Sequence, residues 1–336
     1  MLGAPLHERN AVLMRILVAA IVVLSAGACD PTLGLTLPSE RALEDGAANG
    51  LTAAKSFELK GAYLTIGGAA WNVDLQFTRD AEHVTASTGG VSVEGIILGP
   101  VAYFRGQTFL ASHVGTDPLS QNIVKVAGNA WWKGDPGFIP AMKDFTDGAT
   151  FRATFLGSAN TMRSDHQSVD GQDAVELSGT RADVVIQAAP PHHLVRVHLK
   201  KGVVVDGLSE ADLHYSNFDR IALIKPPSDV IDFSNLSTLP PVYIVVSVDT
   251  SGCAVPCAVS AALKNLGGAT GATGPSLITF TLTAAVSGAQ LGTCQAAVEP
   301  DVGYNATTTV SCTINLNTPP ENAAVVTASV SNPGRG

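Results

Sequence analysis

The feature that most constrains the fold is the alternation of apolar and polar residues from about residue 53 to residue 104. A period of two places successive side chains on opposite faces of a β-strand, so each run predicts a strand with one apolar and one wet face. Turn-forming pairs such as Gly89-Gly90 and Gly99-Pro100 separate the runs and favour an antiparallel meander over strand–helix–strand units. The large apolar residues of these runs include Trp71, Val73, Leu75, Phe77, Val93, Ile97 and Tyr103.

The middle of the chain, residues 111–172, is less regular. Phe138, Met142 and Phe145 are spaced as one apolar stripe of a short helix, which Pro140 limits or kinks. We expect a polar loop at 165–171. Strand alternation returns at 173, and a last strand is expected from 218 to 232. The apolar positions of these later strands include Val197, Leu199, Leu213 and Tyr215, and the middle region also carries the adjacent pair Trp131 and Trp132.

A change in composition marks a second domain. Residues 29–239 contain 40 charged residues in 211, whereas residues 240–336 contain six in 97. The boundary falls in the proline-containing stretch 237–241, which is typical of a short stiff linker. Threonine-rich alternating runs at 278–284 and 305–316 predict a small β-sandwich that resembles bacterial immunoglobulin-like modules.

The N-terminal segment has the layout of an export signal. The apolar run 16–24 is about half the ~20 residues that a membrane-spanning helix needs, and small residues follow it. Ala26-Gly27-Ala28-Cys29 resembles a lipobox, which predicts that Cys29 carries acyl chains. The sequence departs from the usual lipobox at one position, where Ala26 stands in place of leucine. The alternative is an ordinary secretory signal with a chance cysteine. Met14 would be a more usual start than Met1.

These observations divide the chain into four parts. Residues 1–28 are expected to be the signal peptide, and 29–52 the lipidated N-terminus and tether, with a helical turn at 38–51 left open. Residues 53–235 form the first domain, and 236–336 form the sandwich. Lipidation at Cys29 would anchor the protein to a membrane outside the cytoplasm of a bacterium.

Four further cysteines lie in the last quarter of the chain. An even number of cysteines in an exported protein predicts disulfides, and three pairings are possible. We favour Cys294–Cys312 across a hairpin, with Cys253–Cys257 closing a short loop. The paired spacing of a zinc site is absent, so no metal is expected.

The order of elements in 53–235 resembles a known family. After the sheet meander come a Gly-Asn-Ala-Trp-Trp section, a small helical insert, an alternating hairpin, and Asn217-Phe218-Asp219 leading to Pro226-Pro227-Ser228. This order is similar to the mycobacterial LppX/LprG-type lipoproteins, which have the LolA-like fold. The resemblance implies a mainly β, α+β first domain: a curved antiparallel half-barrel whose concave face is covered by short helices. It also implies an apolar cavity that holds lipid or glycolipid acyl chains.

The resemblance assigns cavity-lining roles to the apolar residues of the first domain. The alternative for each is plain core packing, and the residues alone do not separate the two. The candidate lining residues are Trp71, Val73, Leu75, Phe77, Val93, Ile97, Tyr103, Trp131, Phe138, Met142, Phe145, Val197, Leu199, Leu213 and Tyr215.

Other function classes find little support in the sequence. A net charge of −9 with scattered Lys and Arg gives no electrostatic footprint for nucleic acid. Catalytic and nucleotide-binding motifs are absent, and the histidines at 192, 193, 198 and 214 fit a solvated surface better than a metal site. We therefore expect that the protein is not an enzyme and has no cofactor. We expect it to be a membrane-anchored lipoprotein that carries a lipid or glycolipid across the cell envelope. The alternatives are a non-transporting surface lipoprotein that docks an envelope partner through its sandwich, and an enzyme of unrecognised type.

Overall fold

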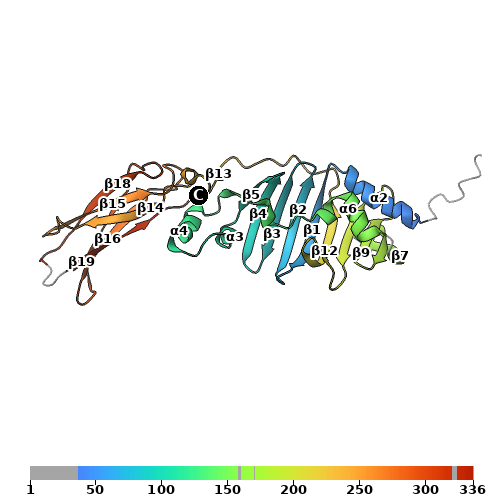
Figure 1. Cartoon of the computed structure of the whole chain (residues 1–336), viewed down its shortest axis with the longest axis horizontal. Coiled ribbons are helices and arrows are strands. Elements are labelled where there is room, and N and C mark those ends of the chain that lie inside the picture. The colour runs from blue at the N-terminus through green and yellow to red at the C-terminus, as the bar shows by residue number, and fades with distance from the viewer. Residues whose placement is uncertain (1–36, 158–159, 170, 320–323, 336) are drawn as a thin grey trace, which may run out of the picture.

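The computed structural model describes residues 37–157, 160–169, 171–319 and 324–335, and the fold is mainly β, as predicted (Figure 1). Cys29 and the expected signal peptide lie outside the described residues. One large sheet forms the first part of the chain, and two small antiparallel sheets form the second. Figure 1 shows these two parts one after the other along the long axis, with helices against the large sheet.

The large sheet is open, because its two edge strands, at residues 230–231 and 160–169, do not pair with each other in the described part of the chain. Every neighbouring pair is antiparallel except the first, so the sheet is mixed rather than wholly antiparallel. From edge to edge the strands are β13 (Val230–Ile231), β6 (Trp131–Gly134), β5 (Val101–Arg105), β4 (Val91–Leu98), β3 (Glu82–Thr88), β2 (Ala70–Thr78), β1 (Ser56–Thr65), β12 (Leu208–Ser216), β10 (Leu194–Leu199), β9 (Ala182–Gln187), β8 (Gln172–Gly179) and β7 (Asn160–Val169), with β11 (Val204–Val205) pairing β12.

The alternating pattern buries one face of this sheet. Leu59 of β1, Leu75 of β2 and Val84 of β3 lie in one cross-strand row, and each is at most 3% exposed. We call this buried side the inner face and the opposite, polar side the outer face. A sheet with one apolar face must bury it against another layer, and here short helices supply that layer.

The covering helices explain the local sequence signals. Ser39 caps the helix at residues 40–53 by accepting a hydrogen bond from the Ala42 amide, and Leu43, Ala47 and Leu51 face the sheet. The helical alternative left open for 38–51 is therefore the one observed, and this helix shares the core of the first sheet. The helical elements are α2 (Glu40–Ala53), α3 (Gln107–Ala111), α4 (Pro118–Ala127), η1 (Pro136–Phe138), α5 (Lys143–Thr146), α6 (Gly148–Phe151), the π-helical turn η2 (Arg152–Leu156) and η3 (Leu236–Thr238).

Three predicted elements differ from the structure. The helical stripe 138–145 is broken: Phe138 ends η1 and α5 begins only at Lys143, because Pro140 has no amide hydrogen to donate. The expected loop 165–171 is wrong, since β7 continues through Val169 as a solvent-exposed edge strand. The expected strand 218–232 is also wrong. Only β13 forms there, after Pro226-Pro227.

The second part is a β-sandwich with a core of its own. Tyr243, Leu263 and Phe280 are each at most 1% exposed, and they pack between the two sheets. One sheet contains β14 (Tyr243–Asp249), β15 (Cys257–Asn265) and β18 (Thr307–Ile314). The other contains β17 (Gln290–Ala297), β16 (Leu277–Ala284) and β19 (Ala324–Ser331).

Both predicted disulfides are present. Cys253 and Cys257 close a tight loop with their Cα atoms 3.9 Å apart. Cys294 and Cys312 are bonded with their Cα atoms 6.2 Å apart, but they do not span a hairpin. Cys294 lies on β17 and Cys312 on β18, so this bond joins the two sheets of the sandwich.

The last described residues of the sandwich return to the first domain. The Arg335 amide donates to the Val126 carbonyl at the end of α4. The side chain of Arg335 is 15% exposed, and its Nη1 lies 3.0 Å from Oδ1 of Asp229. The two parts are thus in direct contact through this segment.

Candidate functional site

An apolar cavity of about 390 Å³ lies on the inner face of the first sheet. Its floor is one end of strands β1 to β4, and its cover is helix α3 with the segment 137–140. This volume falls within the range of ~300–1,000 Å³ that is usual for ligand pockets. The lining residues are Tyr63, Thr65, Ile66, Gly67, Trp71, Ala86, Val93, Phe109, Gly137, Phe138, Ile139, Pro140, Asp206 and Gly207.

Strand alternation and one small residue create the floor. Tyr63 pairs with Trp71 across β1 and β2, and Ala86 pairs with Val93 across β3 and β4. All four side chains point to the inner face because strand residues alternate between faces. Ala86 is small, so the floor is deeper at that point than beside the two aromatic rings.

The cover is held by aromatic packing. The Phe138 ring lies 4.3 Å from the His113 ring, 5.8 Å from Phe104 and 6.0 Å from Trp132, measured between ring centroids. Phe138 is nevertheless 37% exposed. Because Pro140 interrupts the helical pattern here, the cover is an irregular segment that leaves space beneath it.

Two turns form the rim. Ile66, in the turn between β1 and β2, is 82% exposed although it is a large apolar residue. Asp206, in the turn between β11 and β12, accepts a hydrogen bond of 2.6 Å from the Asp144 amide of α5. That bond fixes the turn against the covering helices. The exposed isoleucine gives the cavity an apolar entrance.

One polar group stands out in the cavity wall. Tyr63 is 3% exposed, and its hydroxyl makes no hydrogen bond with any residue that the structure describes. Burial raises the pKa of Tyr63 to about 12, so the hydroxyl stays protonated at neutral pH. The hydroxyl belongs to the cavity wall, so it can donate a hydrogen bond to an acceptor of a bound ligand.

Aromatic rings of the covering helices pack on the inner face next to Tyr215 of β12. The Phe155 ring lies 5.3 Å from the Phe145 ring and 5.0 Å from the Phe151 ring, measured between ring centroids. These rings and Leu43 of α2 lie in the same core as Val197 and Leu213. A separate pocket of about 360 Å³ lies beside Leu194 of β10 and Tyr215 of β12, with Phe218 in its lining.

The structure places the candidate lining residues in four groups. Trp71, Val93 and Phe138 line the cavity. Phe77 and Ile97 are partly buried at the margin of the core. Tyr103 and Trp131 are half-buried on the outer face, since Phe104 and Trp132 occupy the inner positions of the same strands. The others are fully packed in the core: Val73, Leu75, Met142, Phe145, Val197, Leu199, Leu213 and Tyr215.

Several lining residues were not among the sequence candidates. Tyr63 and Ala86 sit in strands that the alternation predicts, so strand parity could have indicated them. Phe109 and Ile139 come from covering segments whose position over the sheet depends on the whole fold. No local signal identifies those two.

Other kinds of site are not assembled by the described residues. No group of three or more metal-ligating side chains comes together among them. His193 stacks on Phe218 with ring centroids 4.2 Å apart, whereas Asp212 pairs with Arg196 on the outer face. Within the described ranges, no helix is both long and apolar enough to cross a membrane. No protein-family model and no curated protein matches the chain.

Proposed function

We propose that this protein binds the acyl chain of a lipid or glycolipid in the inner-face cavity and carries it within the cell envelope. The observation that supports this most is the cavity itself: an apolar hollow with an exposed apolar rim and one tyrosine hydroxyl without a protein partner in its wall. Such a site recognises its ligand by shape and apolar burial, at about 0.8 kcal/mol per buried CH₂.

The volume of the cavity limits the length of the acyl chain that it can hold. If each methylene occupies about 30 Å³, as a water molecule does in the liquid, about 13 methylenes fill the 390 Å³. One acyl chain fits, and further chains of the same lipid would remain outside. The Tyr63 hydroxyl would then donate to an ester or carboxyl oxygen of the ligand.

The two disulfides agree with a location outside the cytoplasm, because such bonds persist in oxidising compartments. Anchoring through Cys29 is part of the proposal and rests on the sequence. A carrier tethered in this way would receive and release lipid at a membrane surface.

Displacement of a fluorescent fatty acid from the full chain tests the binding step. Ala86→Phe fills the cavity floor and should weaken binding at least tenfold. Ala62→Phe places the same bulk on the exposed outer face of β1 and should leave binding unchanged. Equal binding by both variants, with unchanged thermal unfolding, would refute the cavity as the lipid site. Vesicle-to-vesicle transfer of a labelled lipid then tests carriage.

A second candidate is a surface protein that docks a partner through the sandwich. Edge strand β14 favours it, because Ile244 is 37% and Val246 is 59% exposed there. Exposed apolar residues on an unpaired edge mark interaction surfaces. A Val246→Lys variant that keeps lipid binding but loses attachment to isolated envelopes would support docking.

A further inference from the structure

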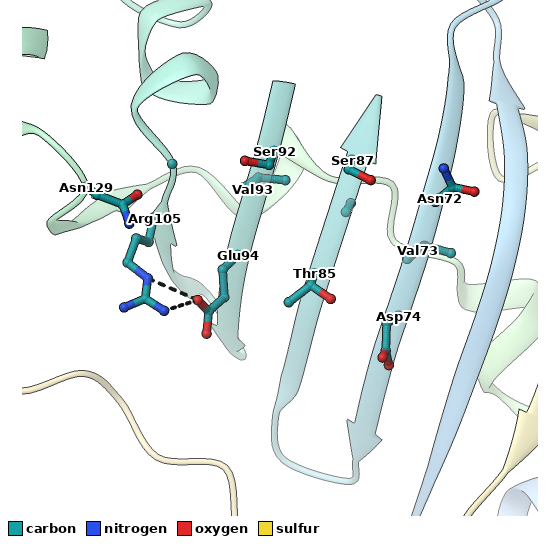
Figure 2. Close-up of a pocket in the computed structure, with 12 residues that line it drawn as sticks. Asn72, Val73, Asp74, Thr85, Ser87, Ser92, Val93, Glu94, Arg105 and Asn129 are labelled. Carbon is teal, nitrogen blue, oxygen red and sulfur yellow. Dashed lines mark hydrogen bonds and ion pairs between the residues drawn. The ribbon is translucent and has the colours of Figure 1, made fainter. Parts of the chain in front are cut away.

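A groove of about 430 Å³ lies on the outer face of β2, β3 and β4. The inner face of the same strands forms the floor of the proposed lipid cavity. Figure 2 shows its lining side chains on β2, β3 and β4, with Arg105 and Asn129 at one end. In contrast to the cavity, eight of the twelve residues that line this groove have polar side chains. The two sites are separated by the thickness of the sheet.

The groove runs between two cross-strand rows of polar side chains. One row is Asn72, Ser87 and Ser92, and the other is Asp74, Thr85 and Glu94. The floor between them is the backbone at Val73, Ala86 and Val93, whose side chains point to the inner face. Residues two apart on a strand are about 7 Å apart, and three strands span about 10 Å. The groove therefore has room for a narrow polar chain.

One end of the groove is closed by a close approach of the backbone. Gly106 has a φ of +142°, and a Cβ there would lie 2.4 Å from the Ser92 carbonyl oxygen. Any residue with a Cβ would clash at this position, so only glycine allows the chain to turn from β5 into α3 this close to β4. This turn brings Gly106 into the groove wall beside Asn129.

The charged groups at this end are held in place. Nε of Arg105 donates to Glu94 at 3.0 Å, and Nε2 of His83 lies 2.9 Å from the same carboxylate. Arg105 also lies over the Trp131 ring, 4.9 Å from its centroid. Burial works to raise the pKa of Glu94, but the hydrogen bonds from His83 and Arg105 lower it overall, so the carboxylate is ionised. The side chains of Glu94 and Arg105 are therefore already held in fixed positions before a ligand binds.

The uncharged groups are free to bind a ligand. The side chains of Asn72, Thr85, Ser87, Ser92 and Asn129 are exposed, and none makes a hydrogen bond with another residue in the described part of the chain. Together they offer hydroxyl and amide groups that both donate and accept. Strands β2, β3 and β4 are paired on both sides, so binding here must use side chains rather than strand addition.

We propose that this groove is a binding site for a neutral, hydroxyl-rich carbohydrate chain. Vicinal hydroxyls both donate and accept, and they match amides, hydroxyls and a fixed carboxylate–guanidinium pair. The ionisable lining residues are Asp74, Glu94 and Arg105, which disfavours a phosphate or other anion. The two rows of polar side chains disfavour an acyl chain. The site is independent of the lipid cavity and does not rest on the proposed function.

An array of neutral, sulfated and phosphorylated oligosaccharides, probed with the full chain, tests this proposal. We expect binding to neutral oligosaccharides, with affinity measured by calorimetry for the best of them. The double variant Asn72→Ala, Ser87→Ala removes two exposed groups without protein partners, so the fold should be unaffected. Two lost hydrogen bonds should weaken binding about tenfold.

Gln76→Ala is the matched control, because Gln76 lies on β2 and on the same face but outside the groove. Its affinity should equal that of the unmodified chain. Three outcomes would overturn the proposal: no neutral oligosaccharide bound above background, binding confined to the anionic oligosaccharides, or binding unchanged in the double variant.

Discussion

The hydroxyl of Tyr215 donates a hydrogen bond of 2.8 Å to the backbone carbonyl oxygen of Phe145. Tyr215 lies on the inner face of β12, and Phe145 belongs to α5, which covers that face. Burial raises the pKa of Tyr215 well above its usual value, so the hydroxyl remains a donor. This bond connects β12 to the helices that cover the inner face.

Tyr215→Phe should lower the free energy of unfolding by about 1–2 kcal/mol, because it leaves the Phe145 carbonyl buried without a partner. Urea unfolding followed by circular dichroism measures the loss. Tyr103→Phe is the control, since Tyr103 is half-exposed and its hydroxyl has no partner among the described side chains. Equal stabilities for the two variants would mean that the bond contributes nothing measurable.

Gly148→Ala should destabilise the first domain by about 1–3 kcal/mol through overpacking. A Cβ at Gly148 would lie 2.1 Å from the Ala48 carbonyl oxygen, so α6 could not approach α2 as closely. Gly157→Ala is the matched change, because the nearest atom to a Cβ there is 3.6 Å away. Thermal unfolding should separate the two variants, and a stable Gly148→Ala protein would argue against the tight contact between α2 and α6.

Replacing Cys294 and Cys312 by serine should destabilise the sandwich by about 3 kcal/mol, whereas replacing Cys253 and Cys257 should cost about 2 kcal/mol. The bonds close loops with sequence separations of 18 and 4, and loop-closure entropy grows with length. The longer bond also joins two sheets. Calorimetry of both double variants measures the difference. A larger loss from the short loop would show that chain entropy is not the main term.

Sequence alternation predicted the strands well because burial of one face imposes a period of two. It did not decide which of two adjacent aromatic residues faces inward. Trp131 and Trp132 are neighbours, so one must point to each face, and Trp132 is the one that enters the core. The exposed edge strand β7 escaped detection, since a strand with no buried face has no reason to alternate.

The location of the cavity could not be predicted in the same way. It depends on where the covering segments leave space, and that is set by contacts such as Phe138 against His113, 25 residues apart in the sequence. The helix α4 did carry a local signal. Asp117 caps it, with Pro118 at its first position, a combination that is favoured at helix starts.

Lys60 connects two carboxylates on the outer face of the first sheet. Its Nζ lies 2.9 Å from Glu58 and 3.2 Å from Asp74. Burial works to raise the Glu58 pKa, but hydrogen bonds from Lys60, Asn217 and Ser216 lower it overall. Burial raises the Asp74 pKa, and Lys60 opposes that rise.

The two carboxylates have opposite effects on stability as the pH falls. Glu58 stabilises the fold above its unfolded-state pKa, and this contribution is lost as the pH falls through its lower folded pKa. Asp74 is destabilising when ionised, and that penalty is relieved as the pH falls through its raised folded pKa. The two contributions to the pH dependence of stability therefore oppose each other in the unmodified protein.

Lys60→Met should raise the pKa of both carboxyls, because it removes a hydrogen bond and a positive charge from each. The variant should be about 1–2 kcal/mol less stable at pH 7, because charged hydrogen bonds to Glu58 and Asp74 are lost. Part of this loss should be regained at pH 4, where the carboxyls take up protons more readily in the folded state. Urea unfolding at the two pH values, with carbon NMR titration of the carboxyls, measures both effects.

Lys55→Met, at an exposed lysine whose side chain has no ion pair among the described residues, should show neither effect. A Lys60→Met deficit that is the same at both pH values would mean that lost packing, and not the carboxylates, is its cause.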